Sequence, residues 1–379
     1  MGPYRHQSSL EAILDFSACQ HFTPDQRTRA RTKLYSIIDH CNTPHDRSLV
    51  KYNRPLLLRY TYEYARSDLS QDMVLSAIVN WLGFSVDGEA IDFSDEDVAD
   101  NLRERLMEFA DFLLDNFFTP LKAAGLHTSQ PSPAPLPAVQ GAIDGEQIYV
   151  ETPDRLSMLR GACLIRDHYR CVISHKFDLT EALKRFKNHG TDAQDEEGNP
   201  LHGQPFDSLQ VAHILPHALM KSGHDSQLSE SKRATLNILD MFDHGVVRLI
   251  EGIDIDRPFN AITLSPSLHT LFGGFEIFFE PVPSQLHTYQ VKPFLPEIFP
   301  DLSVTRTLYP SVDCTIDAPL PRFFAIRSAI AHILHLSGAG EYIEKILRDL
   351  ENIGGHGDGS TELGRLVMLR LGDWADVKC

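Results

Sequence analysis

The first third of the chain is patterned for helices. Apolar residues recur at three- and four-residue steps, and polar residues that can cap a helix stand near the start of each run. The predicted helices cover residues 8–16, 24–38, 70–82 and 94–113. We therefore predict an α-helical domain over residues 1–126, in which the alternating stretch 60–64 leaves helix and strand open.

The pattern changes after this helical part. Residues 129–137 read Ser-Gln-Pro-Ser-Pro-Ala-Pro-Leu-Pro, which offers few backbone donors for a sheet and favours extended backbone. We predict that residues 127–150 form a Pro-rich linker or a strap across the surface. A helix is expected over 153–166, and a mobile, polar and acidic loop over 188–203 then separates two apolar extended runs.

Strands and helices are expected again in the last part of the chain. Strands are predicted over 275–279 and 288–291, and helices over 322–336 and 341–350. The fold class predicted from these patterns is α+β. Its regions are a mixed domain over 151–300, a C-terminal helical region packed on it over 301–352, and a Gly-rich segment with a tail helix over 353–379.

Composition narrows the class of protein. The chain has 379 residues, of which 42% are hydrophobic, which is enough for a buried core in two or three folding units. No apolar run reaches the roughly 20 residues that a membrane helix needs. The cysteines are scattered and form no C-x-x-C pair of the kind that holds structural zinc (Cys19, Cys41, Cys163, Cys171, Cys314 and Cys379). We predict an intracellular, cytoplasmic protein without a membrane partner, and leave its oligomeric state open.

The net charge of the chain indicates which binding partners are favoured. The net charge is −17, and residues 151–300 carry 14 Lys or Arg against 20 Asp or Glu. Proteins that bind nucleic acid draw most of their affinity from neutralising phosphates. The charge therefore disfavours nucleic acid as a partner.

The candidate chemistry lies between residues 171 and 280. His213 stands within the apolar run Val-Ala-His-Ile-Leu-Pro, Asn260 opens the run Asn-Ala-Ile-Thr-Leu, and His269 follows on a predicted short helix that continues to Phe272. This order, with a strand after it, resembles the HNH nuclease family in the divergent form common in fungal proteins.

The resemblance implies a ββα core in which two antiparallel strands and one helix pinch a divalent metal. We expect the strand at Cys171 to form a hairpin with the strand of His213. The resemblance makes His213 the general base, Asn260 the residue that ties the loop to the strands, and His269 a metal ligand. It implies magnesium or manganese as the cofactor of a nuclease.

Two positions depart from the family pattern. Ala212 stands where many of these nucleases carry a metal-binding Asp or His, and Gly273 stands where a carboxylate often follows. A single imidazole is a poor site for a cation that prefers oxygen ligands. Asp254 or Asp256, in the acidic turn before Asn260, could supply oxygen, although we interpret that turn as solvated.

Three functions follow as alternatives. The fold can be reused, without a cofactor, for non-hydrolytic chemistry on an apolar small metabolite, such as a Diels–Alder-type intramolecular cyclisation, since 21 Phe and 11 Tyr could line a pocket. The chain can instead be a metal-dependent endonuclease on DNA or RNA. It can also be a non-catalytic interaction protein in which His213 and His269 satisfy a core. We favour the first hypothesis over the second.

Overall fold

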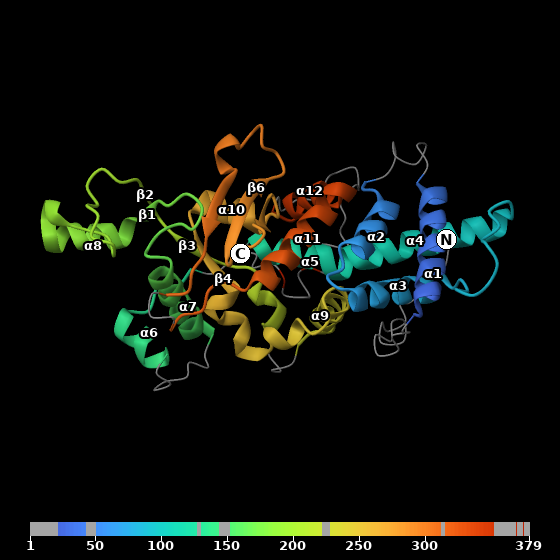
Figure 1. Cartoon of the computed structure of the whole chain (residues 1–379), viewed down its shortest axis with the longest axis horizontal. Helices are drawn as coiled ribbons and strands as arrows, with labels where there is room; N and C mark the ends of the chain where they lie inside the picture. Colours follow the sequence, from blue (N-terminus) through green and yellow to red (C-terminus); the bar gives the residue numbers. More distant parts are fainter. Residues whose placement is uncertain are drawn as a thin grey trace. The chain divides into compact units, whose positions relative to one another are not determined.

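The structure is a computed structural model that describes residues 22–42, 51–126, 130–143, 152–221, 228–311 and 315–351, with Leu369 and Trp374 (Figure 1). Its contacts divide the chain into two compact units. The first contains the chain up to Phe118, with Arg233–Val247 and Ile333–Tyr342, and the second contains Thr119–Lys232, Arg248–His332 and the chain from Ile343. The predicted helix over 8–16 and most of the region 353–379 lie outside the described residues, and the predicted domain boundaries stay predictions.

The first unit is built from helices. Thr23 starts α1 with a capping box to Gln26, and Asp95 starts α4 by accepting from the N–H groups of Asp97 and Val98. The helices predicted over 24–38, 70–82 and 94–113 are therefore confirmed. The elements are α1 (Pro24–Cys41), α2 (Arg54–Glu63), α3 (Asp68–Leu82), α4 (Glu96–Leu113), the π-helix Leu114–Phe118 and most of α9 (Glu230–Phe242).

The alternating stretch 60–64 belongs to α2, which ends at Glu63 and has Tyr64 as its C-cap. Asn53 caps α2 by accepting from the N–H group of Leu56, and the helix buries Leu57, Leu58 and Tyr62 on one side. Tyr60 and Tyr64 meet edge to face one turn apart on the other side. The aromatic alternation that resembles a strand is therefore accommodated by helical spacing.

The second unit combines helices with small sheets, so the predicted α+β class is confirmed. Its helices are α5 (Thr119–Leu126), α6 (Leu136–Ile143), α7 (Thr152–Arg166), α8 (Leu179–His189), α10 (Pro266–Gly273), and parts of α11 (Pro321–Ser337) and α12 (Ala339–Glu351). Its strands are β1 (Phe177–Asp178), β2 (Phe206–Asp207), β3 (Gln210–His213), β4 (Ala261–Leu264), β5 (Ile277–Pro281), β6 (Thr288–Pro293) and β7 (Val304–Thr307). The last three form one antiparallel sheet in the order β5-β6-β7.

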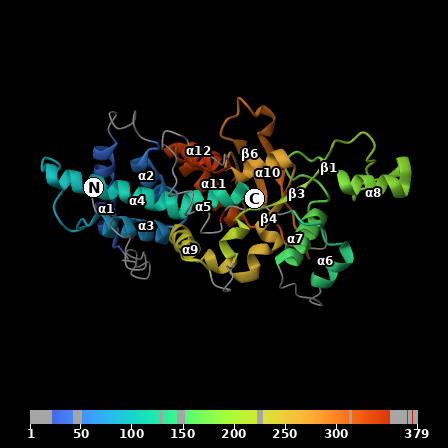
Figure 2. The same cartoon turned by 180° about the vertical axis from the view of Figure 1, so that it is seen from behind.

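An antiparallel ribbon of β3 and β4 positions the candidate site. Gln210 pairs with Leu264 at one end of the ribbon, and His213 pairs with Ala261 at the other. The ribbon lies between α7 and α10, which is visible from the front and from behind (Figures 1 and 2). Val211 packs on Leu159 of α7. Because side chains alternate along a strand, His213 faces α7 as well, whereas Gln210 and Ala212 face α10.

The predicted hairpin between Cys171 and His213 is wrong. Residues 171–174 form a turn in which the N–H group of His175 donates to the carbonyl of Cys171. The N–H group of Val172 donates to the carbonyl of Thr263, so this turn borders β4. Positive φ angles at Tyr169 and His175 bend the chain on both sides of the turn, which prevents a strand. The first strand comes later, where β1 pairs in parallel with β2.

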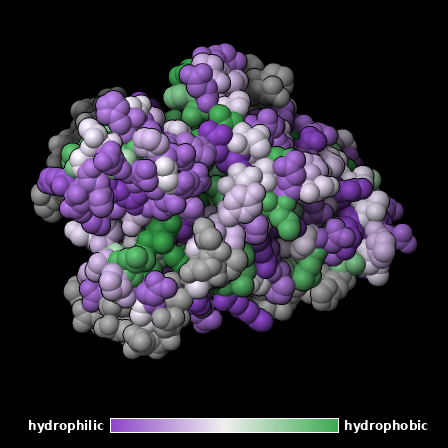
Figure 3. Space-filling view, turned by 60° about the vertical axis from the view of Figure 1, so that its left-hand side comes forward, coloured by the Kyte–Doolittle hydropathy of each residue, from purple (hydrophilic) through white to green (hydrophobic). Residues whose placement is uncertain are grey.

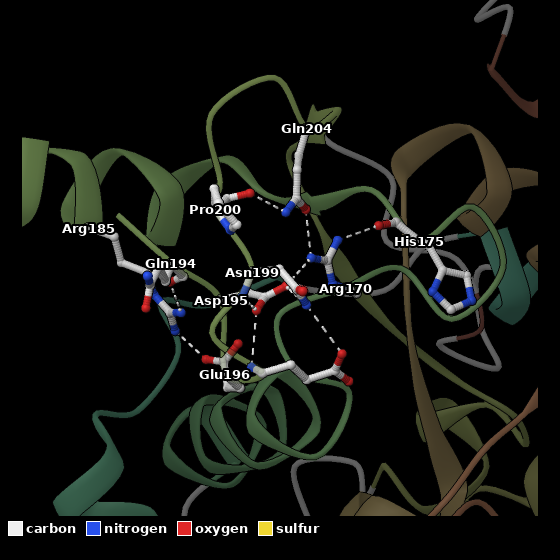
Figure 4. Close-up of polar contacts among 10 residues, drawn as sticks. Arg170, His175, Arg185, Gln194, Asp195, Glu196, Asn199, Pro200 and Gln204 are labelled. Carbon is white, nitrogen blue, oxygen red and sulfur yellow. Dashed lines mark hydrogen bonds and ion pairs between the residues drawn. The ribbon is translucent and has the colours of Figure 1, made fainter. Parts of the chain in front are cut away.

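The segment predicted as a mobile polar loop over 188–203 begins with the end of α8, a helix that the sequence patterns did not predict. The residues after α8 are held by side-chain contacts. Arg170 donates to Asp195 Oδ2 at 2.7 Å, to Gln204 Oε1 at 2.6 Å and to the carbonyl of His175 at 2.9 Å (Figure 4). Arg185 of α8 donates to the carbonyl of Gln194. Phe177, Ala182, Ala193 and Leu201 form a small core beneath these contacts.

The Pro-rich stretch packs as a strap against α7. Ala134 donates its N–H group to the carbonyl of Ser157, and Val139 of α6 lies in a cluster with Ala162. A Cβ atom at Gly161 would lie 2.6 Å from the carbonyl oxygen of Ala134, so only glycine permits this approach. Residues 136–143 are helical rather than extended, because α6 buries Val139 against α7.

The surface is mainly polar on the side shown in Figure 3, where hydrophobic residues appear in separate patches. The exposed large hydrophobic residues lie in different parts of the chain, among them Leu136, Leu183, Leu286, Ile298 and Tyr309. Of the helices in the described ranges, none combines the length and the apolar character that crossing a bilayer requires.

Candidate functional site

Asp256 is the centre of a polar cluster on the α7 side of the ribbon. It ends a short 3-10 helix (Gly252–Asp256), and its side chain is only 1% exposed. Its Oδ1 atom lies 3.0 Å from Nε2 of His213 and 2.7 Å from Nδ1 of His217. Its Oδ2 atom accepts from Nε of Arg155, on α7, at 3.0 Å. The turn predicted to be solvated therefore buries this carboxylate.

The ionisation of Asp256 fixes the tautomers of both imidazoles. Burial alone would raise the pKa of Asp256, but the hydrogen bonds from His213 and His217 outweigh it and hold the pKa well below its ordinary value. An ionised carboxylate only accepts hydrogen bonds. The facing nitrogens, Nε2 of His213 and Nδ1 of His217, therefore carry protons, and in the neutral rings the other nitrogens keep their lone pairs.

His213 is locked inside the protein. Burial lowers the pKa of His213 although Asp256 acts in the opposite direction, so the ring is neutral at pH 7. Its Nδ1 atom is buried and has no hydrogen-bond partner in the described part of the chain. The nitrogen that would act as a base is thus removed from solvent.

His217 occupies the solvent side of the same carboxylate. It begins a 3-10 turn (His217–Met220) after Pro216, and its side chain is 18% exposed. The centroids of the His213 and His217 rings are 5.7 Å apart. Because Nδ1 of His217 is fixed by Asp256, its Nε2 atom is the free nitrogen.

Asn260 joins the two segments that carry this cluster. Its side chain is buried, donates to the carbonyls of Leu215 and Ile255 at 2.9 Å each, and accepts from the N–H group of Leu215 at 2.9 Å. Leu215 precedes His217 in the chain, and Ile255 precedes Asp256. Asn260 therefore fixes the distance between the imidazole and the carboxylate.

His269 lies on the other face of the ribbon, on α10. Its Nδ1 atom is 2.6 Å from Oε1 of Gln210. Burial, the positive charge of Arg327 and the neighbouring His213, in this order of effect, together lower the pKa of His269 to about 4. His213 and His269 thus sit near each other but bond to different partners on opposite sides of β3.

Arg327 contacts α10, the helix that carries His269, and its charge lowers the pKa of that histidine. The guanidinium lies 3.9 Å from the ring centroid of Phe272 and 4.1 Å from that of Phe275, and it donates to the carbonyls of Ile214 and Phe272. Burial lowers the pKa of Arg327 to about 9, so it remains charged at pH 7. No carboxylate among the described residues neutralises this charge, which explains why it acts on His269.

The family positions do not fit a magnesium site. Ala212 has no ligand atom, and Gly273 has no side chain. The backbone of α5 also comes close at Gly125, where a Cβ atom would lie 2.5 Å from the carbonyl oxygen of Gly273. His269 alone remains, and a hard cation prefers oxygen ligands. The predicted metal role of His269 therefore has no support from its neighbours.

His213, His217 and Asp256 form a second set whose ligand atoms lie within 4.8 Å of one another. Two nitrogens and one oxygen suit a transition metal such as zinc better than magnesium. A metal here would force a proton onto Nδ1 of His213, which is buried without an acceptor, at a cost of about 1–3 kcal/mol. Arg155 already supplies a positive charge to the carboxylate. The set therefore fits a hydrogen-bonded carboxylate better than a metal.

Sequence reasoning found three of these residues and missed the connections between them. His213, Asn260 and His269 were candidates, and Asp256 was considered as an oxygen ligand. His217 and Arg155 were not considered. The spacing of His213 and His217 around Pro216 was visible in the sequence, but only the buried carboxylate shows that both rings serve one centre.

Part of the chain matches a known family. Residues 171–280 match the family described as HNH endonuclease, which confirms the resemblance drawn from residues 213, 260 and 269. The predicted fungal source stays a prediction. No curated protein and no solved structure matched the chain.

Proposed function

We propose that this chain, whose residues 171–280 match the HNH endonuclease family, cleaves phosphodiester bonds by acid–base chemistry at the cluster around Asp256. The succession of β3, β4 and α10 supports a ββα core of the HNH type. The proposal concerns the cluster on the α7 side, which contains two imidazoles.

The observation that carries the proposal is the buried carboxylate with two histidine partners. A carboxylate that fixes one ring nitrogen leaves the other as the proton-accepting atom and stabilises the ring once it is protonated. Such a pair can contribute about 100- to 10,000-fold to a reaction that needs proton transfer. Hydrolysis of a phosphodiester needs it, because water must lose a proton as it attacks phosphorus.

A second candidate is non-hydrolytic chemistry on an apolar small metabolite, and the net charge of −17 favours it. A polyanionic substrate is repelled by an acidic protein, whereas an uncharged molecule is not. The Diels–Alder-type cyclisation belongs to this candidate and stays a prediction. The cluster supports it less directly, because its polar groups suit proton transfer better than the enclosure of an apolar chain.

The test is a substrate panel with the whole chain. Supercoiled DNA, single-stranded RNA and bis(4-nitrophenyl) phosphate are incubated with the wild type, with added magnesium, manganese or zinc and with EDTA. The matched control is the double variant His213→Gln, His217→Gln, with folding checked by circular dichroism, because it reports contaminating nuclease. We expect cleavage of at least one phosphodiester by the wild type alone. If folded wild type cleaves none of them under any condition, the phosphodiesterase proposal is wrong and the metabolite candidate takes its place.

A further inference from the structure

We propose that His217, rather than His213, is the catalytic residue that exchanges a proton with the substrate, and that His213 is a positioning residue. The choice of substrate rests on the proposed function. The assignment of the two histidines rests on the geometry around Asp256 and can be tested without any substrate.

Access separates the two rings. The lone pair of His213 is on Nδ1, which is buried and has no partner in the ranges that the structure describes. The side chain of His213 is 3% exposed, and that of His217 is 18% exposed. A substrate must approach the accepting nitrogen to within about 3 Å, so only Nε2 of His217 can meet one without rearrangement of the core.

Orientation also favours His217. Its Nδ1–H group donates to Asp256 Oδ1 at 2.7 Å, the shorter of the two contacts to that oxygen. Asp256 is in turn fixed by Arg155 on its other oxygen. This places an ionised carboxylate behind the ring and the accepting nitrogen in front of it, as a general base requires.

The backbone before His217 is held in place by hydrogen bonds and by a proline. Asn260 pairs with both the N–H and the carbonyl of Leu215, and Pro216 restricts the backbone directly before His217. His213 helps to fix the carboxylate, because its Nε2–H group donates to the same oxygen of Asp256. The role of His213 is therefore to orient the carboxylate on which His217 depends, by a hydrogen bond to it.

The reaction at His217 balances without a further reactant. Nε2 takes a proton from the attacking water as the water oxygen forms a bond to phosphorus. The bond from phosphorus to the leaving oxygen breaks, and that oxygen keeps the electron pair. The imidazolium of His217 then returns the proton to the leaving oxygen or to solvent, which regenerates the neutral ring.

The first experiment reads the histidines directly. In ¹⁵N-histidine-labelled protein at pH 7.5, we expect a protonated Nδ1 with unprotonated Nε2 for His217, and the opposite tautomer for His213. Assignments come from the His217→Gln and His213→Gln variants. Diethyl pyrocarbonate followed by peptide mass spectrometry should modify His217 at least about tenfold faster than His213. Equal or reversed reactivity, or the opposite tautomer at His217, overturns the assignment even if the chain cleaves phosphodiesters.

The second experiment uses the phosphodiester cleaved fastest by the wild type. We expect His217→Ala to lower kcat by about 100-fold or more with little change in KM, and free imidazole to restore part of kcat. His213→Gln, which can still donate to Asp256, should keep kcat within about tenfold. The control is His202→Ala, an exposed position after Leu201, which should match the wild type.

The outcomes separate this inference from the proposed function. Loss in His217→Ala with imidazole rescue supports both. Full activity in His217→Ala with loss in His213→Gln makes His213 the base and overturns the inference. Loss in both variants without rescue also overturns it, because a purely structural role gives that result. If the wild type cleaves no phosphodiester, the proposed function fails, and the tautomers and reactivities still decide whether His217 is the accessible base.

Discussion

Nδ1 of His217 lies 2.7 Å from Oδ1 of Asp256, and the carboxylate is buried while the ring reaches solvent. The relationship joins two segments far apart in the sequence, one after β3 and one before β4. Ala212 and Gly273 occupy positions where the family pattern often has metal ligands. The pair of His217 and Asp256 has the groups for proton transfer without any contribution from those two positions.

Asn260→Ala tests how that relationship is maintained. The substitution removes three hydrogen bonds at a fully buried side chain and leaves the N–H and carbonyl of Leu215 and the carbonyl of Ile255 without these partners. We expect a loss of about 2–4 kcal/mol in the free energy of unfolding, measured by urea denaturation. Asn260→Asp should destabilise at least as much as Asn260→Ala, because a buried carboxylate would face the carbonyl oxygens of Leu215 and Ile255 without a donor. An unchanged stability in Asn260→Ala would show that the loop is held in another way.

Elements that depend on local contacts could be predicted from the sequence, whereas pairings between distant segments could not. The helices α1, α3, α4, α7 and α11 follow from local apolar spacing and caps, and all were predicted. The hairpin partner of His213 was not, because β3 pairs with β4 across a long insertion while Cys171 lies in a turn. Tyr169 and His175 adopt positive φ angles although neither is a glycine, so this turn has no signature in the sequence.

For the candidate site, the sequence could likewise indicate residues but not the contacts between them. The family order singled out His213, Asn260 and His269, and the structure puts all of them at the ribbon. What it could not supply is the direction of each side chain, since β3 sends Gln210 and His213 to opposite faces. The burial of Asp256 depends on packing against Arg155, which is remote in the sequence.

The pH dependence of stability should reveal His269. Its pKa is about 4 in the folded protein against an ordinary value of 6.5, so the unfolded chain binds a proton more readily over this interval. Stability from the neutral ring is present above pH 6.5 and is lost as pH falls towards 4, by about 3 kcal/mol in total. Urea denaturation between pH 7.5 and 4.5 should show this loss. His269→Gln should flatten the curve, leaving the part due to His213, whereas an unchanged slope would contradict the assignment.

Magnesium should bind weakly. The family positions offer one imidazole and no carboxylate, and Arg155 neutralises the one carboxylate of the cluster. Isothermal titration calorimetry of the whole chain at pH 7.5 should give no saturable binding of magnesium or manganese below about 1 mM. Zinc is the informative comparison, because two nitrogens and one oxygen suit it better. Tight binding of one magnesium per chain would restore a metal-dependent mechanism at His269.

The most direct test of the central claim is the cleavage rate of Asp256→Asn beside that of Asp254→Asn. Both residues lie in the same 3-10 helix, but only Asp256 contacts the imidazoles, whereas Asp254 pairs with Arg257 on the surface. The rate is measured under single turnover at 20 °C, where circular dichroism shows both variants folded. The account predicts a fall of about 100-fold or more in Asp256→Asn and a rate within about twofold of the wild type in Asp254→Asn. Equal rates in the two variants would contradict it, because the carboxylate would then have no part in the chemistry.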